Sequence, residues 1–88
     1  MKYFTATIKD PVGLHARPAS LAVQAATKFK DAEIFIHWKN KSANLKSILN
    51  VMNLAIMNGQ EIKVEATGKQ AEEAINAIKK VMTDNHLI

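Results

Sequence analysis

Four short segments of this 88-residue chain alternate apolar and polar side chains, the pattern of a β-strand with one buried face. In the first segment, Phe4, Ala6 and Ile8 share one side. Lys39 and Asn40 separate the second and third segments and are typical of a tight turn, because asparagine tolerates positive φ. We therefore expect four strands, two of them joined as a hairpin. The segments are residues 2–9, 33–38, 41–45 and 61–66.

Three other segments carry apolar residues at helical spacing: residues 16–28, 48–57 and 70–83. Ser47 is a preferred residue for the N-cap of the second helix, and Asn58-Gly59 is expected to end that helix in the left-handed conformation. The order β-α-β-β-α-β-α predicts an α+β fold of two layers, an open-faced sandwich in which a four-stranded antiparallel sheet carries three helices on one face. The apolar pattern alone leaves several strand orders open.

Length and composition narrow the class of protein. The chain is expected to form one domain over residues 1–88. It has no cysteine, and His15, His37 and His86 lack ligand-like spacing, so we expect no disulfide, metal or cofactor. No run approaches the roughly 18 apolar residues of a membrane span and no signal-peptide core is present, which favours a cytoplasmic protein without membrane insertion. The net charge of +4 permits binding to acidic surfaces without selecting one.

Residues 13–20, Gly-Leu-His-Ala-Arg-Pro-Ala-Ser, carry the candidate chemistry. Pro18 is tolerated in the first turn of a helix and not in its interior, so His15 is expected at the helix N-terminus. Unpaired N–H groups and the helix dipole favour an anion there, and Arg17 adds donors suited to a phosphate. These parts describe a neutral imidazole poised for nucleophilic attack, with a phosphoryl group as the stabilised product. The residues equally allow a histidine that only caps the helix.

The same residues resemble a known family. Gly-Leu-His-Ala-Arg-Pro-Ala near position 15 of a chain of this length is similar to the histidine-containing phosphocarrier proteins (HPr) of the bacterial phosphoenolpyruvate:sugar phosphotransferase system. The resemblance continues through residues 44–48, 51–54 and 58–62, and so covers nearly the whole chain. It implies the strand order 1-4-2-3. It also implies that His15 accepts a phosphoryl group from enzyme I and passes it to the IIA domains of sugar permeases.

In that role His15 is expected to attack through Nδ1, with the backbone amides of Ala16 and Arg17 and the Arg17 guanidinium stabilising the phosphate. Catalysis then consists of positioning and charge stabilisation shared with the partner. The resemblance implies a phosphohistidine transfer intermediate, and we expect no independent turnover of a small-molecule substrate. His37 and Trp38 are unusual for the family but lie away from the motif.

Ser47 is a candidate regulatory site. The resemblance implies that in members from low-GC Gram-positive bacteria the corresponding serine is phosphorylated by an ATP-dependent HPr kinase/phosphorylase, and that a transcriptional regulator reads the mark. A phosphate at a helix start gains from the dipole, so its charge of about −1.5 to −2 would act on partners by repulsion and leave the helix folded. A plain N-cap contributing about 1 kcal/mol explains Ser47 equally well.

A carrier also needs a surface around its histidine that partners can contact. The segment 48–57 holds more apolar residues than one buried stripe requires, so some of them are expected outside. Methionine suits a surface that accepts several partners, and basic residues at the rim speed encounter with acidic ones. The predicted docking residues are Ser20, Gln24, Lys28, Ile48, Leu49 and Met52. Val51, Leu54 and Ala55 are expected in the core, and the chain is expected to act as a monomer.

Two other functions stay open at this point. A paralogue with the same histidine chemistry could serve a regulatory branch of the system and no sugar. A small basic module could bind nucleic acid through its sheet, but the strand aromatics form no paired stacking platform and this function leaves the His15 motif unused. We therefore expect no nucleic-acid partner.

Overall fold

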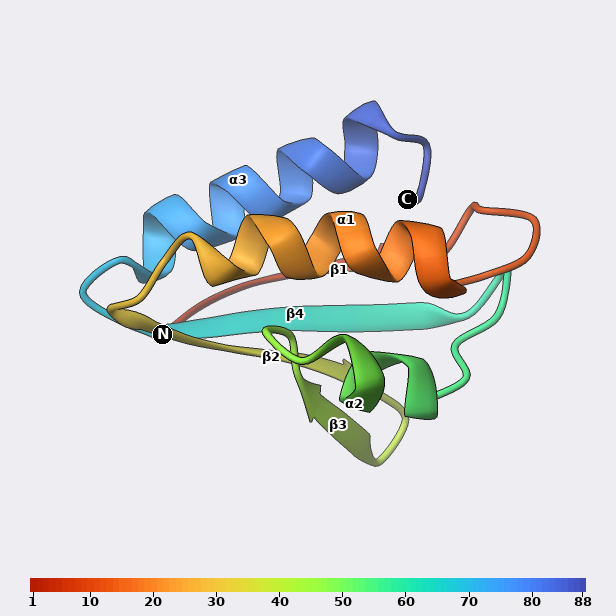
Figure 1. Cartoon of the computed structure of the whole chain (residues 1–88), viewed down its shortest axis with the longest axis horizontal. Coiled ribbons are helices and arrows are strands. Elements are labelled where there is room, and N and C mark those ends of the chain that lie inside the picture. Colours follow the sequence, from red (N-terminus) through yellow and green to blue (C-terminus); the bar gives the residue numbers. More distant parts are fainter.

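Four strands and three helices follow one another in the order β1-α1-β2-β3-α2-β4-α3, as predicted (Figure 1). The computed structural model describes every residue, Met1–Ile88. The strands are β1 (Lys2–Thr7), β2 (Ala32–Trp38), β3 (Lys41–Asn44) and β4 (Glu61–Gly68). The helices are α1 (Ala16–Thr27), α2 (Ile48–Asn53) and α3 (Ala71–Asp84). None of these helices has the length and apolarity needed to cross a membrane.

The strands form one antiparallel sheet in the order β1-β4-β2-β3, which confirms the order that the resemblance implies. The register aligns apolar residues across all four strands. Phe4 lies opposite Val64, Val64 opposite Ile36, and Ile36 opposite Ala43. All four are buried. Because side chains alternate along a strand, this row fixes which face of the sheet meets the helices.

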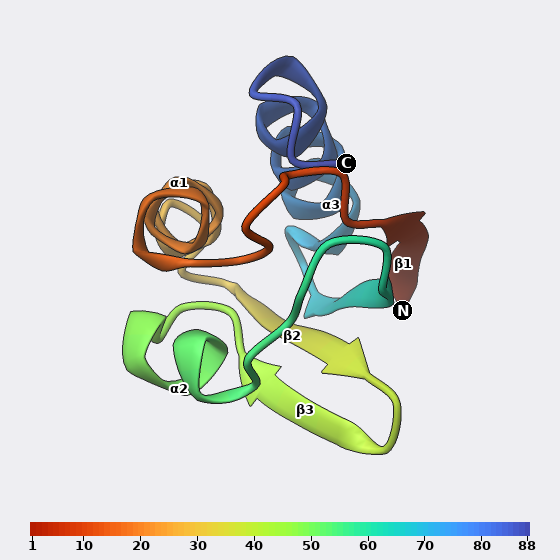
Figure 2. The same ribbon diagram turned by 90° about the vertical axis from the view of Figure 1, so that its right-hand side faces the viewer.

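The helices form the second layer. Helices α1 and α3 lie side by side across the sheet, and α2 packs beside α1 and β3 (Figure 1, Figure 2). The core between the layers contains no polar or charged residue. The opposite face of the sheet is uncovered and carries Tyr3, Phe35 and His37. The predicted α+β open-faced sandwich is therefore confirmed.

The second helix is shorter than predicted and ends at Asn53. The Leu54 N–H donates to Val51 O (3.1 Å) and the Ala55 N–H to Met52 O (3.0 Å), so the last turn tightens. Ala55 then adopts φ +54°, the left-handed conformation that reverses the chain.

Two predictions about this segment are therefore wrong. The left-handed end of the helix falls at Ala55 and not at Asn58-Gly59, and Ala55 is exposed and not in the core. The reversal has a physical reason, because it turns Ile56 inward, where only 2% of its surface is exposed. Burial of Ile56 after a short helix outweighs continued helical pairing.

The β2–β3 hairpin has the predicted two-residue turn, closed by the pair Trp38 and Lys41. The positive φ belongs to Lys39 (+56°), however, and not to Asn40. The Lys39 ammonium lies 5.1 Å from the centroid of the Trp38 ring, a cation–π contact that favours this turn. Strand β4 also extends beyond its predicted end, because Gly68 still pairs with Ala32.

Candidate functional site

His15 occupies the N-cap of α1 with an extended backbone (φ −76°, ψ −174°). Its carbonyl accepts the first helical hydrogen bond, from the Ala19 N–H at 3.0 Å. Its side chain makes no capping hydrogen bond and is 41% exposed. The imidazole therefore stands at the helix start with its ring accessible to another molecule.

The backbone around this ring supplies donors for an anion. The amides of Ala16 and Arg17 precede the first helical hydrogen bond, and Pro18 has no N–H to offer. Arg17 is exposed and takes part in no ion pair, so its guanidinium is available. The imidazole thus stands at a helix start with two free amides, and an unpaired arginine follows two residues later, a combination that suits a phosphoryl group.

The connection between α2 and β4 supports the segment that leads into His15. The Leu14 N–H donates to Ile56 O (2.9 Å) and the Gly59 N–H to Ile8 O (2.8 Å). The Asn58 side-chain amide donates to the carbonyls of residues 9 and 10, at 3.1 and 3.2 Å. Leu14 itself is buried. These hydrogen bonds hold the connection between β1 and α1 against the connection between α2 and β4. Figure 2 shows the course of the two connections.

Gly13 makes this close approach feasible. It has φ +85°, and a Cβ on it would lie 2.4 Å from Ile56 O and 2.7 Å from the Met57 Cα. Only glycine fits such a backbone-to-backbone contact without a shift. A glycine at this position is typical of a turn, but the sequence carries no signal for its distant neighbours.

Asp10 is a further component of the site, and the sequence analysis did not single it out. Its Oδ1 lies 3.5 Å from Nε2 of His15 and also accepts a hydrogen bond from the Val12 N–H at 2.9 Å. The Asp side chain therefore bonds the backbone two residues on, a turn that aspartate commonly forms. The Asp-Pro pair signals the turn, whereas the contact with His15 depends on the fold.

Ser47 is the N-cap of α2, as predicted, and its Oγ accepts a hydrogen bond from the Asn50 N–H at 3.4 Å. The preceding residue, Lys46, does not direct its ammonium at this position. Its Nζ donates to Phe29 O (2.7 Å) and Ala32 O (2.6 Å), which ties the start of α2 to the segment after α1. Ser47 is half-buried.

Three apolar side chains of α2 are exposed as predicted: Ile48 (40%), Leu49 (68%) and Met52 (39%). Val51 and Leu54 are buried, also as predicted. On the adjacent α1, the Gln24 side-chain amide donates to Ser20 Oγ at 3.2 Å. Lys28 is exposed and continues the same i, i+4 row.

Two exposed apolar residues were not singled out from the sequence. Val12 precedes Gly13, and Met57 lies against Gly13 across the loop contact, so the fold brings them together beside the segment of His15. Their positions in two different loops explain why no local pattern identifies them.

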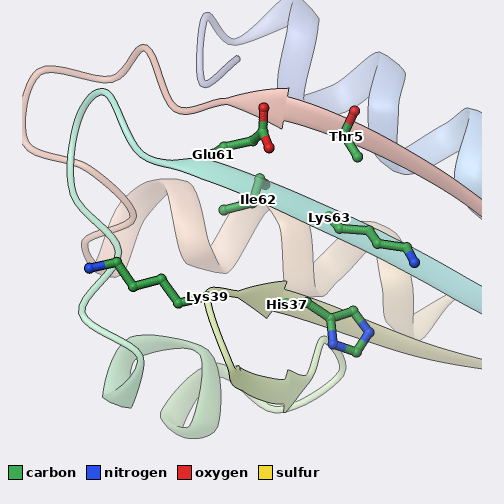
Figure 3. A pocket seen from close by; sticks show the side chains of 6 residues that line it. All are labelled: Thr5, His37, Lys39, Glu61, Ile62 and Lys63. Carbon is green, nitrogen blue, oxygen red and sulfur yellow. The ribbon is translucent and has the colours of Figure 1, made fainter.

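One hollow of about 350 Å³ lies on the uncovered face of the sheet (Figure 3). The Nε2 of His37, at its edge, contacts Glu65 Oε1 at 2.8 Å. Figure 3 shows the side chains of Lys39 and Lys63 pointing away from one another, so the hollow lacks convergent donors. No group of three or more metal-ligating side chains is arranged to hold an ion. The residues that line the hollow are Thr5, His37, Lys39, Glu61, Ile62 and Lys63.

Comparisons with known proteins agree with this architecture. A family model described as the PTS HPr component phosphorylation site matches residues 2–84. Phosphocarrier protein HPr of Mycoplasma capricolum is 51% identical, over 100% of this chain and 98% of the relative. A solved histidine-containing phosphocarrier protein of Mycoplasma is 50% identical with a TM-score of 0.95, over 99% of this chain and 98% of the other. Crh, the Bacillus subtilis catabolite repression protein, solved as a swapped dimer, is 32% identical with a TM-score of 0.74, over 94% of both chains.

The chain shares its four-stranded open-faced sandwich with a solved histidine-containing phosphocarrier protein, and its class is that of the phosphocarrier proteins. The chain belongs to the HPr family and is a phosphocarrier of the phosphoenolpyruvate:sugar phosphotransferase system. The resemblance described from the sequence is thereby confirmed.

Proposed function

We propose that residues 1–88 form one HPr-like domain, a cytoplasmic monomer that accepts a phosphoryl group on His15 from enzyme I and passes it to IIA domains of sugar permeases. One observation carries this proposal: the His15 ring is 41% exposed beside the amides of Ala16 and Arg17 at a helix start. The test is incubation with enzyme I and phosphoenolpyruvate, followed by mapping of acid-labile phosphate. Size-exclusion chromatography tests whether the protein is a monomer in solution.

In the proposed transfer, a lone pair of His15 attacks the phosphorus atom of the phosphohistidine on enzyme I. The new N–P bond forms as the donor N–P bond breaks, and its electron pair returns to the donor ring. The Ala16 and Arg17 amides and the Arg17 guanidinium then stabilise the phosphoryl oxygens. No small molecule is released, so the domain acts as an intermediate between two proteins.

Replacing Arg17 with alanine is expected to slow phosphoryl acceptance by about 10- to 100-fold, because a charged donor to the phosphoryl oxygens is lost. Arg17→Lys should recover part of the rate, since it keeps the charge without the planar fork. Rapid-quench transfer from phosphorylated enzyme I measures both. The exposed Arg17 makes no ion pair, so the melting temperature should stay constant. Equal rates in wild type and Arg17→Ala would rule out this role.

The exposed apolar residues of α2 support a docking surface for both partners, together with Ser20, Gln24 and Lys28 of α1. Leu49→Gln is expected to raise the carrier concentration at half-maximal transfer about fivefold, the effect of losing roughly 1 kcal/mol of contact. Tyr3→Gln is the matched control, because Tyr3 is similarly exposed but lies on the uncovered face of the sheet. A Leu49→Gln curve superimposable on wild type would exclude Leu49 from docking.

Phosphorylation of Ser47 by an HPr kinase/phosphorylase, read by a transcriptional regulator, is the regulatory part of the proposal. The N-cap position supports it, because a phosphate there gains from the helix start. The Lys46 ammonium already binds two carbonyl groups, so the added charge would remain available to repel a partner. Incubation with the kinase and ATP should place one phosphate on Ser47 and none on Ser47→Ala. An unmodified wild-type chain would contradict regulation at this site.

The similarity values favour the sugar-transport branch over a regulatory paralogue. The chain is 51% identical to an HPr but 32% identical to the catabolite repression protein Crh. Loss of sugar uptake on deletion is the result that distinguishes the two branches.

A further inference from the structure

The carboxylate of Asp10 faces the ring of His15, and we propose that it is a positioning residue for phosphoryl transfer. It holds the proton of the neutral imidazole on Nε2 and so leaves the lone pair on Nδ1, the nitrogen expected to take the phosphoryl group. This inference rests on the proposed acceptance of phosphate by His15.

The carboxylate is fixed before any partner arrives. Its Oδ1 accepts a hydrogen bond from the Val12 N–H (2.9 Å), and the carbonyl of the same residue accepts from the Gly13 N–H (3.0 Å). The Asn58 side chain donates to that carbonyl as well, at 3.2 Å. The Asp10 side chain is only 20% exposed. Its distance to the imidazole is therefore a property of the folded loop and not of a flexible surface chain.

The position of the ring proton follows from this distance. A neutral imidazole carries one N–H, on either nitrogen, and an ionised carboxylate can only accept. With Oδ1 3.5 Å from Nε2, a proton on Nε2 is attracted to the carboxylate, whereas a lone pair there would be repelled by it. The contact is longer than a typical hydrogen bond, so its effect in the free protein is electrostatic; such contacts commonly tighten in the reacting complex.

The same carboxylate also assists the transfer step. As Nδ1 attacks the phosphorus atom of the donor phosphohistidine, the donor N–P bond breaks and the donor ring recovers its electron pair. The His15 ring keeps its Nε2–H throughout and gains positive charge as the new N–P bond forms. The Asp10 carboxylate faces that nitrogen, so it stabilises the developing charge, as a carboxylate does for histidine in hydrolytic triads.

Nitrogen NMR tests the proton position directly. In ¹⁵N-labelled wild-type protein at pH 8.5, where histidine side chains are neutral, the two-bond ¹H–¹⁵N couplings distinguish the protonated ring nitrogen. His15 should show the Nε2–H form, and Asp10→Ala, which removes the acceptor oxygen, should move it toward the mixture shown by the exposed His86. His37 is the internal control, because its Nε2 contacts Glu65 and should not respond. An unchanged His15 spectrum in Asp10→Ala would overturn the proposal.

Transfer kinetics supply the second readout. Asp10→Asn keeps an oxygen for the Val12 N–H and is expected to slow acceptance from phosphorylated enzyme I about tenfold, at an unchanged melting temperature. Asp31→Asn removes the same charge beyond the far end of α1, about 18 Å away by helix length, and should transfer normally. An Asp10→Asn rate equal to wild type would refute the role while leaving phosphorylation of His15 intact. Failure of wild type to accept phosphate would instead refute the proposed function.

Discussion

Replacing His15 with alanine is expected to abolish the acid-labile phosphate that, in the proposed function, the chain receives from enzyme I and phosphoenolpyruvate, a loss of at least about 10³-fold. The reason is chemical, because alanine has no nucleophilic atom. No other histidine lies at the start of a helix. Phosphate mapping by mass spectrometry under neutral conditions, with acid lability as a check, measures the loss.

The fold should survive this substitution. The His15 side chain makes no capping hydrogen bond and is half exposed, so the free energy of unfolding should change by no more than about 0.5 kcal/mol. His37→Ala is the matched control, because it removes a histidine from the opposite face of the sheet and should leave phosphate on His15. Undiminished phosphate on His15→Ala would exclude His15 as the acceptor.

Gly13→Ala is expected to destabilise the fold by about 3 kcal/mol and to slow transfer through the displaced loop. The left-handed backbone at φ +85° disfavours any Cβ, and the added atom would lie 2.4 Å from a carbonyl oxygen of the neighbouring loop. That oxygen cannot move freely, since Ile56 O accepts the Leu14 N–H and Ile56 is buried. Urea unfolding measures the change in free energy.

Gly59→Ala separates the two causes. Gly59 has the same φ of +85°, but nothing lies within 4 Å of a Cβ built on it. It should therefore show only the backbone cost of about 1 kcal/mol. Equal destabilisation by the two substitutions would mean that the close approach of the neighbouring loop adds nothing to the cost of Gly13→Ala.

Local pattern was sufficient for much of the fold. The alternation of Phe4, Ala6 and Ile8 predicts β1 because a strand with one buried face repeats every two residues. Helix α3 follows equally from its apolar spacing. The strand order could not be derived this way, since β1 and β4 are distant in sequence, and it came from family resemblance. Part of the site also follows from local pattern, because a proline in the first turn predicts that His15 lies at a helix start.

The features that the sequence did not predict are those whose conformation depends on residues distant in the chain. Nothing near Ala55 in the sequence favours a left-handed conformation, and the helix ends there because Ile56 is needed in the core. Lys39 adopts positive φ in a turn where asparagine is the better intrinsic candidate. Asp10 contacts His15 because of a turn whose geometry is maintained by Asn58, in the connection between α2 and β4. In each case tertiary contacts outweigh local preference.

The hydrogen bonds between the two connections also affect the lifetime of a complex with a partner protein. Because the hydrogen bonds between residues 8–14 and 56–60 hold the histidine segment in place beforehand, docking incurs little entropic penalty for ordering it. We therefore expect a small contact area to suffice for productive encounter and dissociation to stay rapid. A phosphocarrier gains turnover from such short-lived complexes, because each dissociation frees it for the next transfer.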